Sequence, residues 1–177
     1  LSGVYFWLSR SGNVEIGGLK LGGEKEEAAP ENPNALPTIE GGTREKLSNE
    51  NIAVPESAVS EEQKAEFQAK DVAVPSTVLS TPGTENKFRH FNLNGENNQY
   101  SPSTIIVKEG DTVDIGFTSK DRDYNFFLPD LGIYKTVPKG QTQNIQFQGY
   151  PYGKYAFYCK DVCGSAKVEG VLIVTKD

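Results

Sequence analysis

Short runs of alternating apolar and polar residues fill the second half of the chain, and turn residues such as Asn94–Gly95, Pro138–Gly140 and Tyr150–Gly153 separate them. Side chains of a strand point alternately to its two faces, so alternation predicts strands with one buried face. Many short strands without a helical period predict a β-sandwich or barrel. The predicted strands are Lys87–Leu93, Thr104–Lys108, Thr112–Thr118, Tyr124–Leu128, Gly132–Val137, Thr142–Gln148, Lys154–Cys159 and Glu169–Thr175. The predicted core positions are Phe88, Ile105, Val107, Val113, Ile115, Phe117, Phe126, Tyr155, Phe157, Leu172 and Val174.

The segment before these strands has a different composition. Residues 24–85 consist mainly of Glu, Pro, Ser, Ala, Asn and Lys, with Phe67 as their single aromatic residue. Such a stretch buries too little apolar surface to offset the entropy of ordering its backbone, which predicts a linker. Within it, Ser60 as N-cap with Gln63 at the third helical position favours about two helical turns over Ser60–Lys70.

A weak internal repeat lies in the same segment, since Val72–Ser80 resembles Ile52–Ser60. Two copies are too few for a repeat architecture. Either the similarity follows from linker composition alone, or the two segments are extended and add to sheet edges, on a partner or on the domain itself.

The first residues, Leu1–Leu8, are apolar and aromatic, and Arg10 follows them. A membrane-spanning helix needs about 20 residues, but aromatic residues beside an arginine are typical of the interfacial end of such a helix. The segment is interpreted either as the stub of an anchor or signal helix or as an apolar tail that packs on a partner protein. We therefore expect an anchor stub and Gly-rich segment at residues 1–23, a linker at 24–85 and a β domain at 86–177.

Charge and histidine content exclude several classes of function. The net charge is −6 and no cluster of Lys or Arg is present, which argues against nucleic acid as a partner. The single histidine, His90, leaves no Ser-His-Asp triad, Cys-His dyad or histidine-based zinc site. His90 is expected to be an ordinary strand residue with a hydrogen-bonded ring, and the loop carboxylates Asp121, Asp123 and Asp130 are expected to be solvated.

The order of motifs goes beyond periodicity. It resembles the copper domain of the family that contains cytochrome c oxidase subunit II and nitrous oxide reductase. The resemblance rests on Tyr100–Ile105 with Val107–Val113, on Ser119–Asp121 with Asn125–Phe126 and Leu128–Ile133, on Val137–Gly140, and on Gly153–Tyr155, Phe157–Cys159, Cys163–Gly164 and Gly170–Val171. It implies an all-β, Greek-key cupredoxin β-sandwich, here preceded by a long, mostly extended N-terminal arm.

The resemblance also locates the positions of the family's copper ligands. Cys159 and Cys163 keep the spacing of its two bridging thiolates, and Asp161 lies where a backbone carbonyl faces the metal. The first histidine is replaced by Tyr124, the second by Lys167 and the methionine by Gly170. A lysine repels copper, a glycine has no donor side chain, and a tyrosine would have to ionise from a pKa near 10. No cofactor is therefore expected, with copper as the alternative.

Three interpretations of the cysteine pair remain open at this point: a small disulfide, a reduced and redox-reactive pair, or a two-coordinate Cu(I) site. The resemblance implies an extracytoplasmic, membrane-associated protein, in the periplasm or at the cell surface. Two functions follow as expectations. The first is a structural or assembly subunit, without catalytic activity of its own, that binds protein subunits of a membrane-bound or polymeric complex and the membrane through its N-terminal segment. The alternative is a redox or copper-binding electron-transfer protein that uses Cys159 and Cys163.

Overall fold

The computed structural model describes residues 44–47 and 52–176, so the expectations for residues 1–23 lie outside the described residues. Within these described residues, the regular structure consists of one helix and ten strands, with a short 3-10 turn, η1, at Pro129–Leu131. None of the described helices is long and apolar enough to cross a membrane. The elements are α1 (Glu61–Ala69), β1 (Thr77–Ser80), β2 (Lys87–Glu96), β3 (Gln99–Ser101), β4 (Thr104–Lys108), β5 (Thr112–Ser119), β6 (Tyr124–Leu128), β7 (Ile133–Val137), β8 (Thr142–Gln148), β9 (Gly153–Tyr158) and β10 (Glu169–Thr175).

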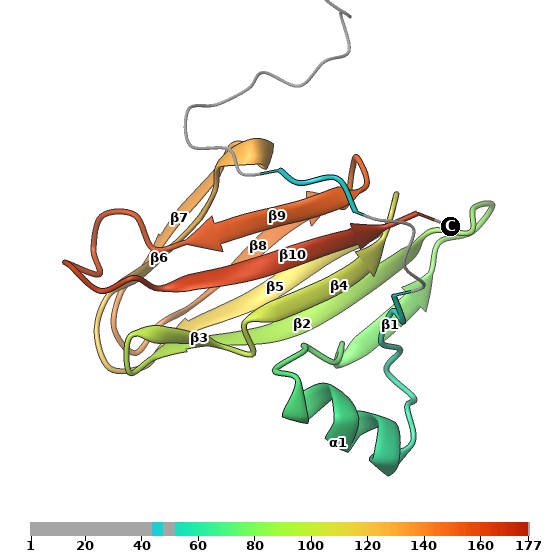
Figure 1. Ribbon diagram of the computed structural model, residues 1–177, viewed down its shortest axis with the longest axis horizontal. Helices are drawn as coiled ribbons and strands as arrows, with labels where there is room; N and C mark the ends of the chain where they lie inside the picture. The colour runs from blue at the N-terminus through green and yellow to red at the C-terminus, as the bar shows by residue number, and fades with distance from the viewer. Residues whose placement is uncertain (1–43, 48–51, 177) are drawn as a thin grey trace, which may run out of the picture. The chain divides into compact units, whose positions relative to one another are not determined.

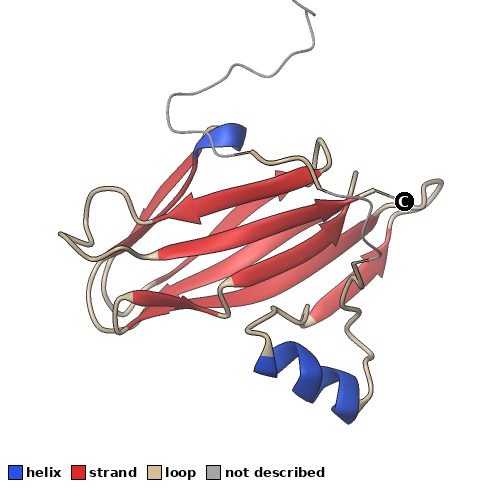
Figure 2. Cartoon of the chain, in the orientation of Figure 1, coloured by secondary structure: helices blue, strands red, loops and turns tan. Residues whose placement is uncertain are grey.

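Two sheets face each other in a β-sandwich, which confirms the predicted fold class (Figures 1 and 2). One sheet has the order β1-β2-β5-β8, with β3 paired to β2, and the other has the order β4-β10-β9-β6-β7. The β2–β5 and β4–β10 pairs are parallel, and the other strand pairs are antiparallel. The bounds predicted for β4, β6, β8 and β10 agree with the structure at both ends.

The core lies between the sheets, and every predicted core residue except Phe88 is buried there. On β2 the alternation is shifted by one residue from the prediction. Arg89, Phe91 and Leu93 are buried, whereas Phe88 is only half-buried. A shift of one residue exchanges the two faces of a strand. The predicted core position Phe88 is therefore wrong, because the inward-facing residues of this strand include a charged one, Arg89.

The positive charge of the buried Arg89 is compensated by Asp111, the residue immediately before β5. Both side chains are fully buried, and Arg89 Nε lies 2.6 Å from Asp111 Oδ2. The outer side of the guanidinium is covered by a segment from far earlier in the chain: Arg89 donates to the carbonyl oxygen of Pro55 (2.8 Å) and to Glu56 Oε1 (3.1 Å). Residues 55 and 56 thus close this end of the core.

Further contacts bind residues 60–80 to the sandwich. The predicted capping box is present, because Ser60 Oγ accepts from Gln63 N (3.3 Å) and Gln63 Oε1 accepts from Ser60 N (3.3 Å). After α1, the buried residues Val72 and Ala73 lie along the edge of β4, where Ala73 N donates to Thr104 O (2.7 Å). Strand β1 then pairs with β2. Residues 72–80, the second copy of the weak repeat, thus add to sheet edges of the domain itself. The linker expected at residues 24–85 therefore ends before residue 85.

Candidate functional site

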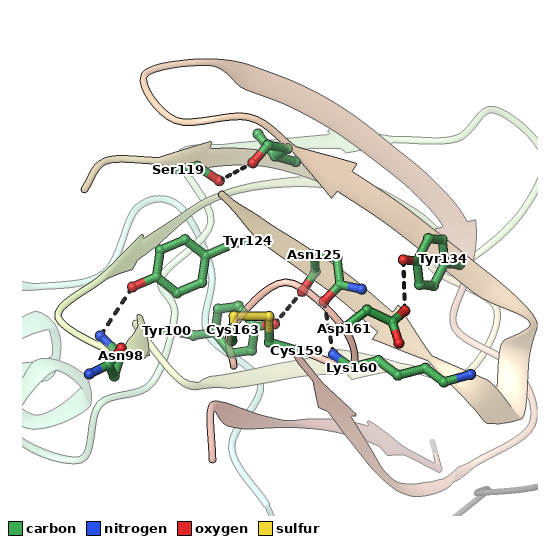
Figure 3. Close-up of a disulfide and its surroundings, with 11 residues drawn as sticks. Asn98, Tyr100, Ser119, Tyr124, Asn125, Tyr134, Cys159, Lys160, Asp161 and Cys163 are labelled. Atoms are coloured by element: carbon green, nitrogen blue, oxygen red, sulfur yellow. Dashed lines mark hydrogen bonds between the residues drawn. A yellow bond between two sulfur atoms is a disulfide. The ribbon is translucent and has the colours of Figure 1, made fainter. Parts of the chain in front are cut away.

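The loop between β9 and β10 carries both cysteines. Cys159 N donates to Val168 O (2.9 Å), which closes the base of the loop beside the antiparallel β9–β10 pair. Cys159 and Cys163 form a disulfide with a Cα–Cα distance of 5.9 Å, and both residues are buried (Figure 3). Of the three interpretations of the pair, the structure contains the disulfide, so neither sulfur is a thiolate in this state.

Asn125 on β6 connects this loop to the rest of the sandwich. Its Oδ1 accepts a hydrogen bond from Lys160 N (2.8 Å), and its backbone oxygen accepts from the Tyr100 hydroxyl (2.6 Å) (Figure 3). Asn125 is fully buried, and burial together with the neighbouring Tyr124 raises the pKa of the Tyr100 phenol well above its ordinary value, so that Tyr100 stays a donor. The sequence analysis missed Asn125, although a polar residue inside a fully buried run such as Tyr124–Leu128 signals a required hydrogen bond.

Tyr124, at the position of the first histidine, is fully buried at the start of β6. Its hydroxyl accepts from Asn98 N (3.1 Å) and donates to Asp121, and Figure 3 shows it directed toward Asn98 and away from the disulfide. Its ring fills the space over Gly95, where an added Cβ would lie 2.7 Å from Tyr124 Cγ. Tyr124 is therefore a core residue that joins β6 to the β2–β3 turn.

The side chains at the other three ligand positions do not converge on the cysteines. Asp161 Oδ2 accepts a hydrogen bond from the Tyr134 hydroxyl (2.9 Å) at the surface. The Lys167 side chain is 82% exposed, and its Nζ lies 3.1 Å from Glu169 Oε2. Gly170 is part of β10, where a Cβ would lie 2.2 Å from Phe157 Cζ. Within residues 44–47 and 52–176, no group of three or more His, Cys, Asp or Glu residues could hold a metal ion.

The remaining candidate residues have local partners. His90 Nδ1 lies 2.6 Å from Asp114 Oδ2 on the neighbouring strand, so its ring is hydrogen-bonded as predicted. Asp121 Oδ2 accepts from Asn97 N (3.0 Å), and Asp123 Oδ1 accepts from Lys139 N (2.8 Å). Burial opposes ionisation of Asp121, but the hydrogen bonds from Asn97 and Tyr124 outweigh it and hold its pKa below the ordinary value. These two carboxylates hold the loops at the β6 end of the sandwich.

An aromatic row lies beside the cysteine loop. Phe127 on β6 contacts Tyr134 on β7 and Tyr158 on β9, with ring centroids 5.9 and 5.1 Å apart, and Lys160 Nζ lies 4.8 Å from the Phe127 ring centroid. A separate groove of about 640 Å³ lies between α1 and the sandwich and contains none of the predicted site residues. It is lined by Ser57, Val59, Glu61, Lys64, Gln68, Asp71, Val72, Val74, Pro75, Ser76, Asn92, Ser101 and Pro102.

One family model and several solved structures are similar to this chain. A family model described as a cupredoxin-like domain matches residues 59–174. A comparison with curated proteins found no match. Similar solved structures include a multicopper oxidase (15% identity, TM-score 0.46), of which this chain spans 46% with 56% of its own length. The metal-binding domain of the Cu(I)-exporting P-type ATPase of Streptococcus pneumoniae D39 has 18% identity and a TM-score of 0.45, with 55% of this chain and 92% of that domain covered. A chain of a heme-copper terminal oxidase dimer has 20% identity and a TM-score of 0.44, with 64% and 88% covered.

Proposed function

The chain belongs to the cupredoxin-like domain family, and we propose that it is an extracytoplasmic structural or assembly domain whose cysteine loop holds no copper. The observation that carries the proposal is the disulfide between Cys159 and Cys163. Copper centres with bridging cysteines need thiolates, and a disulfide sulfur has no thiolate charge to offer a metal. Disulfides persist mainly in oxidising compartments, which supports an extracytoplasmic location.

The residues at the other ligand positions do not fit a dinuclear copper centre either. The Tyr124 hydroxyl is held by Asn98 and Asp121, and its ring is part of the core. Lys167 is a cation that extends into solvent, and Gly170 contributes only backbone. These residues lack the imidazole and thioether donors that would complete a copper centre around two thiolates, so we assign no copper chemistry to the site.

An assembly role needs a surface that keeps its shape without a cofactor, and the packing of this domain supports one. Most core residues come from strands of the two sheets, and the loop adds Cys159, Cys163 and Val168 to this core through packing and a disulfide. The aromatic row at Phe127, Tyr134 and Tyr158 lies on such a rigid sheet. We extend the proposal to a larger membrane-associated complex as the partner, with the N-terminal segment as tether.

Metal analysis of the full-length chain, purified without reductant, tests the absence of a copper site. The chain is incubated with excess Cu(II), desalted, and measured for copper by mass spectrometry and for a thiolate-to-copper absorption band. We expect no stoichiometric copper and no band, and the same result for the matched Cys159→Ser/Cys163→Ser variant. Stoichiometric copper in the wild type that the double variant lacks would overturn the proposal.

The retained cysteine pair favours a second candidate function. If a dithiol breaks the disulfide by exchange, it supplies two electrons and two protons, is itself oxidised to a disulfide, and leaves two thiols in one short loop. Two soft sulfur ligands suit Cu(I). Competition of the reduced chain against a Cu(I) chelator tests this candidate. Cu(I) binding that disappears on reoxidation would favour a redox or copper-transfer role.

A further inference from the structure

The two sheets differ in how they protect their outer strands. An exposed edge strand presents unpaired N–H and C=O groups that can pair with another chain, and short strands, prolines, charges or a covering segment prevent this. Strand β4 has five residues, and the Val72–Ala73 segment pairs with its first residue, Thr104. Strand β1 has four residues and lies between Pro75 and Pro82, and β7 carries the exposed Lys135. These three edges are thus protected.

Strand β8 has none of these protections. It is seven residues long, and its sequence Thr-Gln-Asn-Ile-Gln-Phe-Gln contains neither a charge nor a proline. It is the last strand of its sheet, and within the described parts of the chain nothing pairs with its outer side. The alternation of buried and exposed residues shows that Gln143, Ile145 and Phe147 face the core, while Thr142, Asn144, Gln146 and Gln148 are exposed.

The hydrogen bonds at the two ends of the β5–β8 pair determine which backbone groups are free. Ser119 N donates to Gln141 O (3.0 Å) at one end, and Gly149 N donates to Asp111 O (2.8 Å) at the other. Hydrogen-bonded and non-hydrogen-bonded pairs alternate along an antiparallel ladder. The odd-numbered residues of β8 therefore bond to β5, and the even-numbered ones direct their N–H and C=O groups outward.

This edge is complementary to itself. If two copies pair antiparallel about a two-fold axis at Ile145, Asn144 lies opposite Gln146 of the other copy, and Thr142 lies opposite Gln148. All four outward residues then exchange backbone bonds, which is the isologous contact that a two-fold dimer requires. Amide and hydroxyl side chains contain both donor and acceptor, so identical copies satisfy one another. Although each chain carries a net charge of −6, no charge lies on this strand.

We propose that β8 pairs with β8 of a second copy of this chain, so that the β1-β2-β5-β8 sheets of two sandwiches form one continuous sheet. This inference goes beyond the proposed function and does not involve the cysteine loop. A failed dimer test would therefore leave the copper test unaffected, and the converse also holds.

Sedimentation velocity of the full-length chain over a wide concentration range tests the proposal. We expect the mass to rise with concentration from 19.4 kDa toward that of a dimer. Gln146→Pro removes an outward N–H without removing a β5–β8 bond, because proline is tolerated on an edge whose N–H faces solvent. Asn144→Lys/Gln146→Lys places lysines opposite one another. Each change is expected to weaken dimerisation at least tenfold.

The control is Asn92→Lys, which adds a charge to exposed β2, two strands from the edge, and is expected to leave dimerisation unchanged. Circular dichroism checks that each variant is folded. A wild-type chain that stays at 19.4 kDa at every concentration would refute the proposal. So would a dimer that survives both β8 variants, because it would then be formed by another part of the chain.

Discussion

The buried ion pair between Arg89 and Asp111 allows the stabilising role of the early segment to be tested quantitatively. The Asp111 carboxylate accepts from Arg89 Nε (2.6 Å), from Lys87 N (2.7 Å) and from Lys108 N (3.1 Å). Asp111→Asn keeps the shape of the side chain but removes its charge and turns one acceptor into a donor. The fully buried Arg89 then keeps only Glu56 as its anionic partner.

Removing one member of a buried pair costs about 3–5 kcal/mol, because the other charge is left without compensation. Glu56 remains in contact with Arg89, so we expect Asp111→Asn to lower the free energy of unfolding by about 3 kcal/mol, near the lower limit of that range. With a urea m-value of about 2 kcal/mol/M, the midpoint should fall by about 1.5 M. Domains of this kind have about 5–15 kcal/mol in total, so the variant is expected to stay folded in water.

Urea unfolding followed by circular dichroism measures this change. The matched control is Glu169→Gln, which breaks the exposed pair with Lys167 and should cost less than about 1 kcal/mol. Replacing both buried partners, as Arg89→Met/Asp111→Leu, should recover part of the loss, because an apolar pair leaves no charge unpaired. If Asp111→Asn costs no more than Glu169→Gln, the pair does not carry the stability that its burial implies.

Three further predictions concern other parts of the domain. Gly170→Ala should lower the free energy of unfolding by about 1–3 kcal/mol through overpacking, because its Cβ would lie 2.2 Å from Phe157 Cζ and 2.7 Å from a backbone oxygen. The control is Gly116→Ala, whose Cβ would have its nearest atom at 3.4 Å. Equal thermal stability of the two variants would contradict the packing around Gly170. Burial opposes ionisation of Glu56, yet its hydrogen bonds with Arg89 and Lys87 hold its pKa below the ordinary value of 4.5. The contribution of Glu56 to folding stability is therefore present above pH 4.5 and is lost as the pH falls through the lower pKa of the folded state. The stability difference between wild type and Glu56→Gln should therefore shrink in acid, and a difference independent of pH would argue against these contacts. Burial raises the pKa of Tyr155 to about 12, so its contribution to stability is present below its ordinary value of 10.0 and is lost as the pH rises toward 12. Tyr155→Phe should therefore remove one phenol absorbance change near pH 12 from the folded protein, and a wild type whose tyrosines all titrate near 10 would refute this.

The strands could be predicted from the sequence because burial on one face of a sheet is a local property of alternate residues. The exceptions depend on distant contacts. Strands β1 and β3 have four and three residues, too few for a periodic signal. Arg89 faces inward because Asp111 and Pro55, 22 and 34 positions away, provide its partners. No local pattern contains that information, and the same holds for Val72 and Ala73 on the edge of β4.

At the candidate site, the spacing of Cys159 and Cys163 indicated a common loop but could not decide between a disulfide, free thiols and bound Cu(I). The choice depends on how close the two Cβ atoms are, which the fold determines. The resemblance placed Gly170 at the position of the family's methionine, and the predicted strand Glu169–Thr175 already contained it. In the structure the bond from Cys159 N to Val168 O ends the loop at its base, and Gly170 pairs with Phe157 in the β9–β10 ladder. A methionine at this position would have no free space, so we do not expect Tyr124→His/Lys167→His/Gly170→Met to create a copper centre.

The contacts of the cysteine loop explain how such a loop can be rigid without a metal. A metal that binds several side chains of one loop restrains it by cross-linking. Here the disulfide closes the loop on itself, the bond from Lys160 N to Asn125 Oδ1 ties it to β6, and the bond from Tyr134 to Asp161 ties it to β7. The strands that receive these bonds are held by core residues of the two sheets, and Cys159, Cys163 and Val168 extend that core into the loop. Under the proposed function, these contacts let the loop keep its place without a metal on the sandwich that presents the aromatic row and the β8 edge.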